Sequence, residues 1–303
     1  MFNEAQIRDV AASAIQEDVI AVRKIYAGGM NFVFELILKQ RSLMLKAYPP
    51  ARIHAAISEY NILIAARSAG VIVPQAMMCG TEDEFGYLIY ASVEGSNLNF
   101  DMLGETEQFQ VSQSIIENIW SLTNVTFTYF GSVTDDENKF STWGGFLTDC
   151  IESGEQALAS TGHLASSQLH TMVKYMTTHR LLSMPCKPAL VWGDPKSENI
   201  LMTNNQLSAL LDFESCFSGD PLLSLGYLFA REGDSSLYKE LSAKFNKLIP
   251  FTADDIYFYA LLRLMRISKY LNTVLPTGKK RLPVLSYFPG IQKSLNRINS
   301  QHG

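Results

Sequence analysis

Three polar residues interrupt apolar runs in the second half of the chain, and their types suit one kind of chemistry. Asp194 and Asn199 lie five residues apart in LVWGDPKSENILM, and Asp212 follows in ALLDFE. Asn is a poor strand residue, yet Asn199 stands directly before the apolar residues ILM. An unpaired buried carboxylate at Asp212 would cost several kcal/mol. The pattern D-x4-N-x12-D therefore indicates either a polar turn between buried strands or a site for a metal ion and phosphate.

The metal and phosphate interpretation accounts for all three residues. Mg²⁺ prefers hard oxygen ligands, so an ion held by Asn199 and Asp212 would remove the cost of burying Asp212. Asp194 would then lie close to an attacking hydroxyl and accept its proton. Transfer of a phosphoryl group from ATP needs such a set. It also needs a fixed cation for the α- and β-phosphates and backbone that approaches them closely.

A glycine turn near the N-terminus is the candidate for that backbone. Gly28, Gly29 and Asn31 lie between two strand-like runs, and glycine has no Cβ to block the approach to a phosphate. A plain hairpin turn is the alternative interpretation. The pattern GxxxxGK[ST] is absent, so the turn is not of the Walker A type.

Lys46 and Glu59 are the candidates for the fixed cation and its partner. Lys46 lies on the third strand-like run, where period-two alternation places it on the same face as Met44 and Tyr48. Glu59 lies in the middle of the following helical segment and could pair with Lys46. The alternatives are a strand lysine that reaches solvent and a solvated helix carboxylate.

The elements that must position these residues begin with a small sheet. Three strand-like runs with tight connections favour an antiparallel meander, and two more runs complete a sheet of about five strands. The expected strands are 19–27, 31–40, 42–50, 71–81 and 85–95. Helices are expected over 3–17 and 51–70. In the second helix Ile53, Ile57 and Ile64 fall near one face, and Gly70 is a natural stop.

The rest of the chain is expected to be mostly helical after a hinge at about 91–98, where Gly95 breaks the apolar pattern. The clearest helical segments are 107–120, 166–180 and 251–271. Thr252 is the expected N-cap of the last, with Asp255 at the capping-box position. Residues 190–213 are expected to form two short strands joined by loops. These elements predict an α+β chain with an N-terminal nucleotide-binding lobe, 1–92, and a larger helical lobe for catalysis and substrate binding, 93–303.

Composition and charge exclude several classes of protein. The 303 residues are 47% hydrophobic and 18% charged, which is enough for one large domain or two lobes with cores. A net charge of −5 argues against a chain-wide surface for nucleic acid or anionic membrane. The four scattered Cys, the absence of a signal peptide and the absence of a long apolar run favour a cytoplasmic protein with reduced thiols.

At these motifs the chain resembles the aminoglycoside phosphotransferase and choline kinase branch of the protein-kinase-like fold. WGDPKSENIL…LLDFESCFSGDP is similar to that family's H-G-D-x4-N…I-D-x-E…G-D-P signature. YAGGMNFVFEL, LMLKAY, SEYNILIAARSAGVIVP and YLIYASVEGSNL resemble its nucleotide loop, ATP lysine, helix glutamate and hinge. The resemblance covers about residues 20–230 and implies a bilobal protein-kinase-like fold with a small antiparallel sheet and one helix in the first lobe.

The resemblance implies a role for each candidate. Asp194 would be the catalytic base, Asn199 and Asp212 the Mg²⁺ ligands, Lys46 the phosphate-holding lysine and Glu59 its partner. The adenine would meet the backbone of four residues: Tyr90, Ala91, Ser92 and Val93.

Two positions depart from the family pattern. Trp192 replaces the usual His, which puts the geometry of the loop in question. Ser224 stands where the family often has an Asp, so a supporting carboxylate is missing. Lys196 lies in the same loop and could neutralise charge on the transferred phosphate, or it could be a solvated lysine. The two departures motivate an alternative function, a nucleotide-binding module without turnover.

The acceptor is expected to be a hydroxyl of a small molecule, with ATP or GTP as the donor. Only FESCFSG separates Asp212 from Asp220, so the long segment on which protein kinases bind peptides does not fit. Residues 101–190 hold ten acidic residues against four Lys and Arg, and residues 232–303 hold five against eleven. We expect these two segments to face each other across the acceptor cleft.

The sequence therefore supports two different kinds of acceptor in that cleft, a polycationic one and an apolar, neutral one. The acidic segment would suit polycationic aminoglycosides, but the basic run at 278–281 fits such an acceptor poorly. A group of aromatic residues could line an apolar pocket for a macrolide or another neutral product, although aromatics at helical spacing are more often core. The group is Tyr257, Phe258, Tyr259 and Tyr270.

Overall fold

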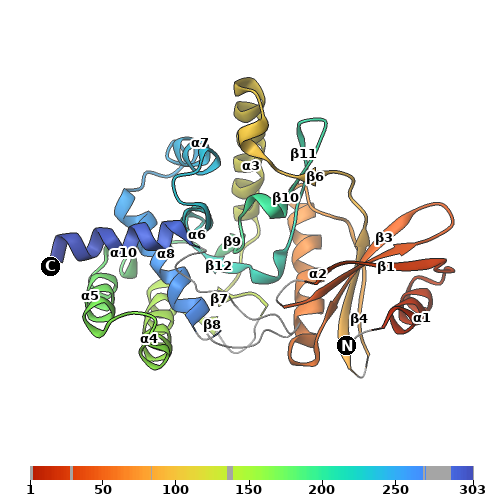
Figure 1. Ribbon diagram of the computed structural model, residues 1–303, viewed down its shortest axis with the longest axis horizontal. Coiled ribbons are helices and arrows are strands. Elements are labelled where there is room, and N and C mark those ends of the chain that lie inside the picture. The colour runs from red at the N-terminus through yellow and green to blue at the C-terminus, as the bar shows by residue number, and fades with distance from the viewer. Residues whose placement is uncertain are drawn as a thin grey trace.

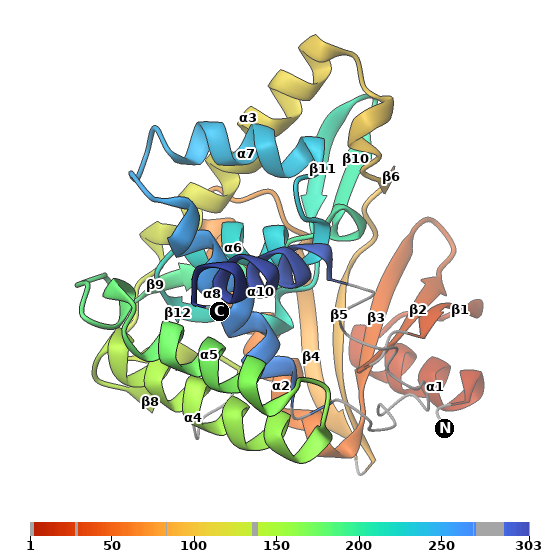
Figure 2. The ribbon, with the colours of Figure 1, turned by 60° about the vertical axis from the view of Figure 1, so that its left-hand side comes forward.

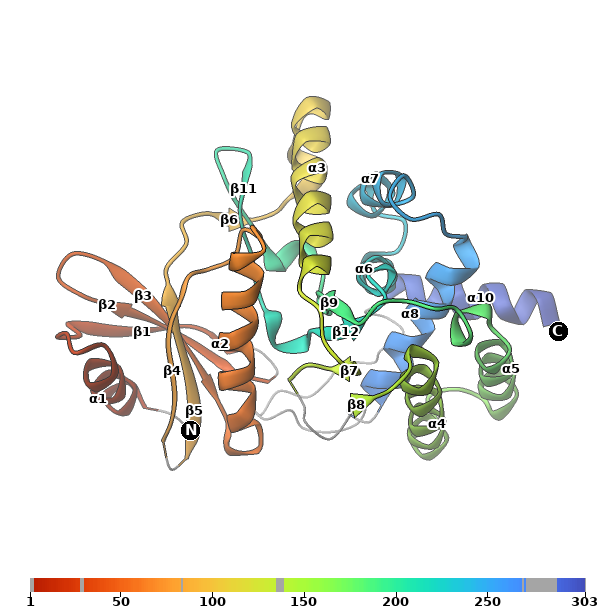
Figure 3. The ribbon, with the colours of Figure 1, turned by 180° about the vertical axis from the view of Figure 1, so that it is seen from behind.

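The protein has two lobes, a small N-terminal sheet with its helices and a larger mainly helical part (Figure 1). The computed structural model describes residues 3–27, 30–82, 84–134, 139–268, 270 and 288–302. Helix α2 (Ile53–Ser68) stands between the sheet and the helical part in all three views (Figures 1, 2 and 3). The α+β prediction is confirmed.

The N-terminal sheet is the predicted five-stranded antiparallel sheet. Its order is β1-β2-β3-β5-β4, so the first three strands form a meander. The strands are β1 (Ala21–Ala27), β2 (Phe32–Ile37), β3 (Ser42–Tyr48), β4 (Ala76–Glu82) and β5 (Phe85–Ala91). Successive side chains alternate between two faces. One face packs on α1 (Glu4–Ile15), and the other packs on α2.

The buried face of α2 differs from the predicted one. Ile57 and Ile64 are 44% and 43% exposed, whereas the side chains that face the protein include Glu59, Ile62 and Leu63. The helix is apolar on all sides, so the spacing of its Ile residues could not identify the inner face. The contacts of Glu59, described below, fix that orientation. The predicted stop is confirmed, because Gly70 follows the helix with φ of 84°.

The helical part is organised around α8, which packs against α4, α6 and α10. Phe258 and Tyr259 of α8 are fully buried. They therefore belong to the core and do not line the apolar acceptor pocket considered for them. The helices are α3 (Glu105–Ser121), α4 (Trp143–Thr161), α5 (Ser166–Thr177), α6 (Leu222–Glu232), α7 (Ser236–Phe245), α8 (Ala253–Ser268) and α10 (Pro289–His302).

Two small sheets cross this part, and they correct the prediction of two strands within 190–213. That segment contributes three strands to two different sheets. One sheet joins β6 (Ser96–Asn97), β10 (Ile200–Thr203) and β11 (Gln206–Leu210). The other joins β7 (Phe130–Ser132), β8 (Lys139–Phe140), β9 (Ala189–Val191) and β12 (Phe217–Gly219).

The connection between the lobes is held by the first small sheet, because β6 pairs with β10 directly after the chain leaves β5. Gly95 lies in this connection with φ of 144°, and a Cβ at this position would lie 2.6 Å from the carbonyl oxygen of Met202. Only glycine fits so close to the neighbouring backbone. None of the helices in the described ranges is long and apolar enough to cross a membrane.

The start of α8 confirms the predicted capping box. The backbone nitrogen and hydroxyl of Thr252 donate to Asp255 Oδ2 over 2.7 and 2.8 Å, and Asp255 N donates back to the Thr252 hydroxyl over 3.3 Å. Arg180 adds two bonds to the same carboxylate, one of them 2.9 Å from Nε to Oδ1. Burial raises the pKa of Asp255, but the bonds from Arg180 and Thr252 outweigh it and the net pKa is lowered.

We predict that Asp255→Ala lowers the free energy of unfolding by about 1–3 kcal/mol at pH 7, because the helix cap and the bonds from the half-exposed Arg180 are both lost. A carboxyl whose pKa is lowered on folding stabilises the protein above its unfolded pKa and loses that effect as the pH falls. The difference between wild type and variant should therefore shrink from pH 7 towards pH 3. Urea unfolding followed by circular dichroism measures both values.

Asp254→Ala is the matched control, because Asp254 is exposed and occupies the same first turn. It should change stability by less than about 0.5 kcal/mol. Equal losses in the two variants would contradict the assigned role of Asp255.

Candidate active site

Asn199 and Asp212 meet at one end of the β10–β11 hairpin. The strands are antiparallel with Ile200 opposite Leu210, and Leu211 N donates to the carbonyl of Asn199 over 2.8 Å. Asn199 and Asp212 therefore lie side by side at the open end of the hairpin, although they are thirteen residues apart in sequence. This arrangement explains the spacing of the last two motif residues.

Asp194 and Asn199 are also brought together, as the sequence predicted. The Asn199 amide nitrogen donates to the Asp194 carbonyl over 2.9 Å and to Asp194 Oδ2 over 3.0 Å. The 3-10 turn η5 (Ser197–Asn199) makes the five-residue spacing short enough for both bonds. Gly193 precedes the pair, and a Cβ there would clash with the carbonyl of Ser215. With its nitrogen engaged, Asn199 has its amide oxygen left to offer a metal.

Two cations hold the Asp194 carboxylate. Lys196 Nζ lies 2.6 Å from Oδ2, and Arg263 Nη2 lies 2.6 Å from Oδ1. Burial raises the pKa of Asp194, but Arg263 and then Lys196 outweigh it, and the net pKa lies well below the usual range. The carboxylate is therefore ionised and can accept a hydrogen bond from a hydroxyl. The solvated alternative for Lys196 is wrong, whereas Arg263 comes from α8 and was not among the sequence candidates.

Lys46 is the centre of the site. Its Nζ lies 2.7 Å from Asp212 Oδ1, 2.9 Å from Glu59 Oε2 and 3.0 Å from Glu214 Oε2. Lys46 is 7% exposed and Glu59 3%, so neither is the solvated residue of the alternative interpretations. Burial lowers the pKa of Lys46, but Asp212, Glu214 and Glu59 together raise it well above the ordinary value. The predicted pairing of Lys46 with Glu59 is confirmed.

Glu214 is a site residue that the sequence analysis did not single out. Besides Lys46, it accepts bonds from the Asn31 amide and from Arg52 Nη1, the latter over 3.3 Å. Arg52 also donates to Asn31 Oδ1 over 3.2 Å. The candidate Asn31 therefore lies in the site, at the start of β2. The sequence signal for Glu214 is that it matches the Glu of the I-D-x-E signature, although the sequence analysis gives it no role.

Asp212 has a strained backbone that its neighbours hold in place. Its φ of 62° and ψ of 70° are left-handed, a conformation uncommon outside glycine. The next residue is fixed because Phe213 N donates to Glu59 Oε1 over 3.0 Å. Glu59 thus orients both Lys46 and the segment that carries Asp212.

The charge around Asp212 fits a divalent cation. Burial raises the pKa of Asp212 to about 6, with the charges of Glu214 and Glu59 adding to the rise and Lys46 opposing it. Carboxylate oxygens of these three acids lie within 4.8 Å of one another. Both oxygens of Glu59 and both of Glu214 accept bonds from protein donors, whereas among the described residues Asp212 accepts such a bond through Oδ1, from Lys46. The residues that fit Mg²⁺ are therefore Asp212 and the amide oxygen of Asn199, both hard ligands.

The two departures from the family pattern, Trp192 and Ser224, contact each other. The Ser224 hydroxyl donates to the Trp192 carbonyl over 2.8 Å, and the Trp192 indole N–H donates to the Leu211 carbonyl over 3.1 Å. The Trp192 ring stacks on Phe213 with centroids 6.0 Å apart. Trp192 therefore ties the strand before Asp194 to the segment that carries Asp212.

The remaining nucleotide candidates are placed only in part. Gly28 and Gly29 lie outside the described residues. Tyr90 and Ala91 end strand β5, with Ser92 and Val93 directly after it. Contact of these four residues with adenine stays a prediction.

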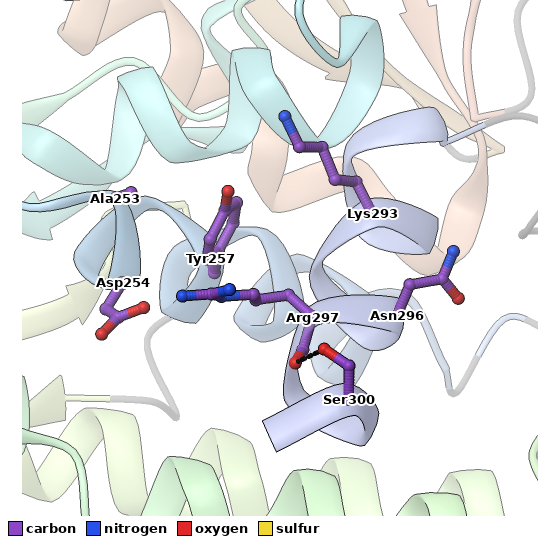
Figure 4. Close-up of a pocket in the computed structure, with 7 residues that line it drawn as sticks. All are labelled: Ala253, Asp254, Tyr257, Lys293, Asn296, Arg297 and Ser300. Carbon is purple, nitrogen blue, oxygen red and sulfur yellow. Dashed lines mark hydrogen bonds between the residues drawn. The ribbon is translucent and has the colours of Figure 1, made fainter. Parts of the chain in front are cut away.

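A separate surface hollow of about 540 Å³ lies between α8 and α10 (Figure 4). None of the catalytic, metal or nucleotide candidates lines it, so it is distinct from the active site. Tyr257 lines it among mainly polar and charged side chains. The basic run 278–281 lies outside the described residues. The lining residues are Ala253, Asp254, Tyr257, Lys293, Asn296, Arg297 and Ser300.

The fold, with a buried lysine and carboxylates at the junction of its lobes, defines a protein-kinase-like structure. The model of the phosphotransferase enzyme family matches residues 22–251, and the chain belongs to this family. A comparison with curated protein sequences found no match.

Solved structures show the same fold at low sequence identity. One is a thermostable mutant of aminoglycoside phosphotransferase APH(4)-Ia in complex with AMP-PNP and hygromycin B. Its TM-score is 0.69 at 16% identity, with 97% of each chain covered. Another is a protein described as a fructosamine-3-kinase from Thermobifida fusca YX-ER1. Its TM-score is 0.70 at 16% identity, with 97% of this chain and 100% of that chain covered.

We predict that Ser224→Ala lowers the free energy of unfolding by about 1 kcal/mol, because the Trp192 carbonyl loses a buried hydrogen-bond donor with little change in volume. Ser112→Ala is the control. Ser112 is equally buried, but its hydroxyl bonds only the carbonyl three residues before it in α3. Such a local helix bond adds little stability. Urea unfolding of both variants measures the difference, and equal values would contradict a supporting role for Ser224.

Proposed function

We propose that the protein is an ATP- and Mg²⁺-dependent phosphotransferase that acts on a hydroxyl group of a small molecule. The observation that most strongly supports this proposal is the 2.7 Å ion pair between Lys46 and Asp212. It joins a cation from the N-terminal sheet to a carboxylate from the other lobe, and Asp212 shares the hairpin end with Asn199. A nucleotide bound between lobes 1–92 and 93–303 would meet both groups.

Each residue has one task in the proposed reaction. Lys46, oriented by Glu59, would bind the phosphates of ATP, and Gly28 and Gly29 would cover them. Asn199 and Asp212 would hold Mg²⁺, which when bound neutralises charge on the β- and γ-phosphates.

The catalytic loop supplies the groups that meet the acceptor. Asp194 would accept a hydrogen bond from the acceptor hydroxyl and then take its proton. Lys196, 2.6 Å from Asp194, would neutralise charge on the phosphoryl group as it moves.

The segment after Asp212 supports a small acceptor. Residues 213–219 form only the turn η6 (Phe213–Ser215) and strand β12, which pairs with β7 and β9. A peptide-binding platform has no room there. The complex of APH(4)-Ia with AMP-PNP and hygromycin B adds support for an ATP-like donor and a small acceptor. Use of ATP would place the protein in the cytoplasm.

We predict a Mg²⁺-dependent thermal shift with ATP in the wild type, which Asp212→Asn abolishes and Asp194→Asn keeps. Asp212 would be a metal ligand, whereas Asp194 would act on the acceptor. Binding stabilises the folded protein by about 2.7 kcal/mol at a hundredfold excess of ligand over its dissociation constant. ADP release should fall by about 10²–10⁴-fold in Asp194→Asn. GTP in place of ATP tests the choice of donor.

Asp149→Asn serves as the control, because it removes one exposed carboxylate outside the site. It should match the wild type in both assays. A wild type that shows no shift with either nucleotide would overturn the proposal. Nucleotide binding without ADP release, on water or on a panel of hydroxylated compounds, would favour the binding module without turnover.

A further inference from the structure

Two arginines of α8 lie about one helical turn apart, and the first of them bonds to the loop that carries Asp194. Arg263 donates through Nη2 to Asp194 Oδ1 over 2.6 Å and through Nη1 to the Gly193 carbonyl over 3.3 Å. Its guanidinium lies between two rings, with Cζ 4.9 Å from the Tyr227 centroid and 5.7 Å from that of Phe288. Arg266 follows three residues later, so both side chains leave the same face of the helix about one turn apart.

Arg266 has no anionic partner among the described residues. No carboxylate oxygen there lies within 4 Å of its guanidinium, and no hydrogen bond to it is formed within those ranges. Its contacts are aromatic, with Cζ 3.9 Å from the Phe217 centroid and 5.5 Å from that of Phe146. The residue is only half-buried. Its Nη1 atom is buried.

Buried polar atoms without a partner gather at these arginines. In the described part of the chain they are Tyr227 Oη, Arg263 Nε and Arg266 Nη1. A buried donor without an acceptor costs about 1–3 kcal/mol. Burial raises the pKa of the Tyr227 hydroxyl to about 12, and the charges of Arg266 and Arg263 act to lower it. Arg263 Cζ lies 4.9 Å from the centre of the Tyr227 ring, and Arg266 and Tyr227 both contact the Phe217 ring. We call these three residues the α8 arginine cluster.

Among the described residues, cations outnumber carboxylates at this face. Lys196 and Arg263 share the single carboxylate of Asp194, and Arg266 adds a third cation. A polycationic acceptor would meet repulsion at this face, whereas an acceptor with a negative group would supply the missing acceptors. Guanidinium groups bind carboxylate and phosphate oxygens in strong, charge-assisted pairs.

We propose that the α8 arginine cluster binds an anionic group, a carboxylate or a phosphate, on the acceptor, so that the substrate is a hydroxylated acid. The inference rests on the proposed function and names its acceptor class. The anion would pair with Arg266 and Tyr227, and the hydroxyl would reach Asp194 about one helical turn away. Anionic acceptors should also draw Arg263 from Asp194, which would release that carboxylate for the hydroxyl.

The test compares matched acceptors on Mg²⁺·ATP-loaded protein. One set is glycerate, glycerol 3-phosphate, neutral glycerol and cationic 2-amino-1,3-propanediol, and a second set is gluconate, sorbitol and 1-amino-1-deoxysorbitol. ADP release at varied acceptor concentration gives kcat/KM. We expect an anionic member to exceed its neutral counterpart by about tenfold or more in at least one set, with the cation lowest. Glycerate against glycerol 3-phosphate distinguishes carboxylate from phosphate.

Variants assign the preference to the cluster. Arg266→Gln should reduce the anionic preference by about tenfold, and Tyr227→Phe should reduce it severalfold. Arg8→Gln is the charge-matched control on α1, where the side chain is 51% exposed, and it should keep the preference. Arg266→Lys keeps the positive charge but lacks the paired N–H donors of the guanidinium. It therefore provides a second variant if Arg266→Gln does not fold.

The acceptor assignment and the phosphotransferase proposal are tested by different outcomes. An absent preference in both sets, or a preference unchanged in Arg266→Gln and Tyr227→Phe, would overturn the acceptor assignment. Mg²⁺·ATP binding is measured on the same samples by thermal shift. If Mg²⁺·ATP still binds but the anionic preference is absent, the acceptor assignment fails and the phosphotransferase proposal does not.

Discussion

The buried ammonium of Lys46 is the constraint on which the rest of the site depends. Removing a cation from water costs several kcal/mol, and carboxylates must offset that cost. Lys46 lies on the N-terminal sheet, whereas its partners come from α2 and from the segment after β11. One charge therefore fixes the sheet, α2 and the Asp212 segment relative to one another. Three carboxylates face this one ammonium, so the pocket keeps an excess of negative charge that suits a divalent cation.

The apolar packing supports the same junction. The core of the helical part continues into the face of α2, while the opposite face of the sheet has its own core with α1. The sheet can thus fold around α1 without fixing the other lobe, and α2 carries the coupling. Trp192 performs a similar task within the second lobe, because its carbonyl and its indole bond two different segments of the catalytic region.

Residues close in sequence were predictable, and partners from distant segments were not. The D-x4-N-x12-D spacing identified Asp194, Asn199 and Asp212, because a short loop and a hairpin end impose those distances. Strand alternation likewise placed Lys46 on the same strand face as Tyr48, which is also buried. The inner face of α2 was missed because its apolar residues surround the helix. Arg263 was missed because it looks like an ordinary helix arginine until folding brings it to Asp194. Glu214 stands in the I-D-x-E signature, but its role was missed because its partners Lys46, Asn31 and Arg52 come from a distant segment.

The enclosure of Lys46 also affects its reactivity as a nucleophile. Amine-directed acylating reagents attack the neutral amine, and three carboxylates hold this amine in its protonated form. In the nucleotide-free protein Lys46 should therefore acylate more slowly than an exposed lysine, although it is the one that a nucleotide would contact. A reagent that carries its own phosphate mimic would compete with the carboxylates for the ammonium. The site thus favours labels shaped like its ligand over small generic ones.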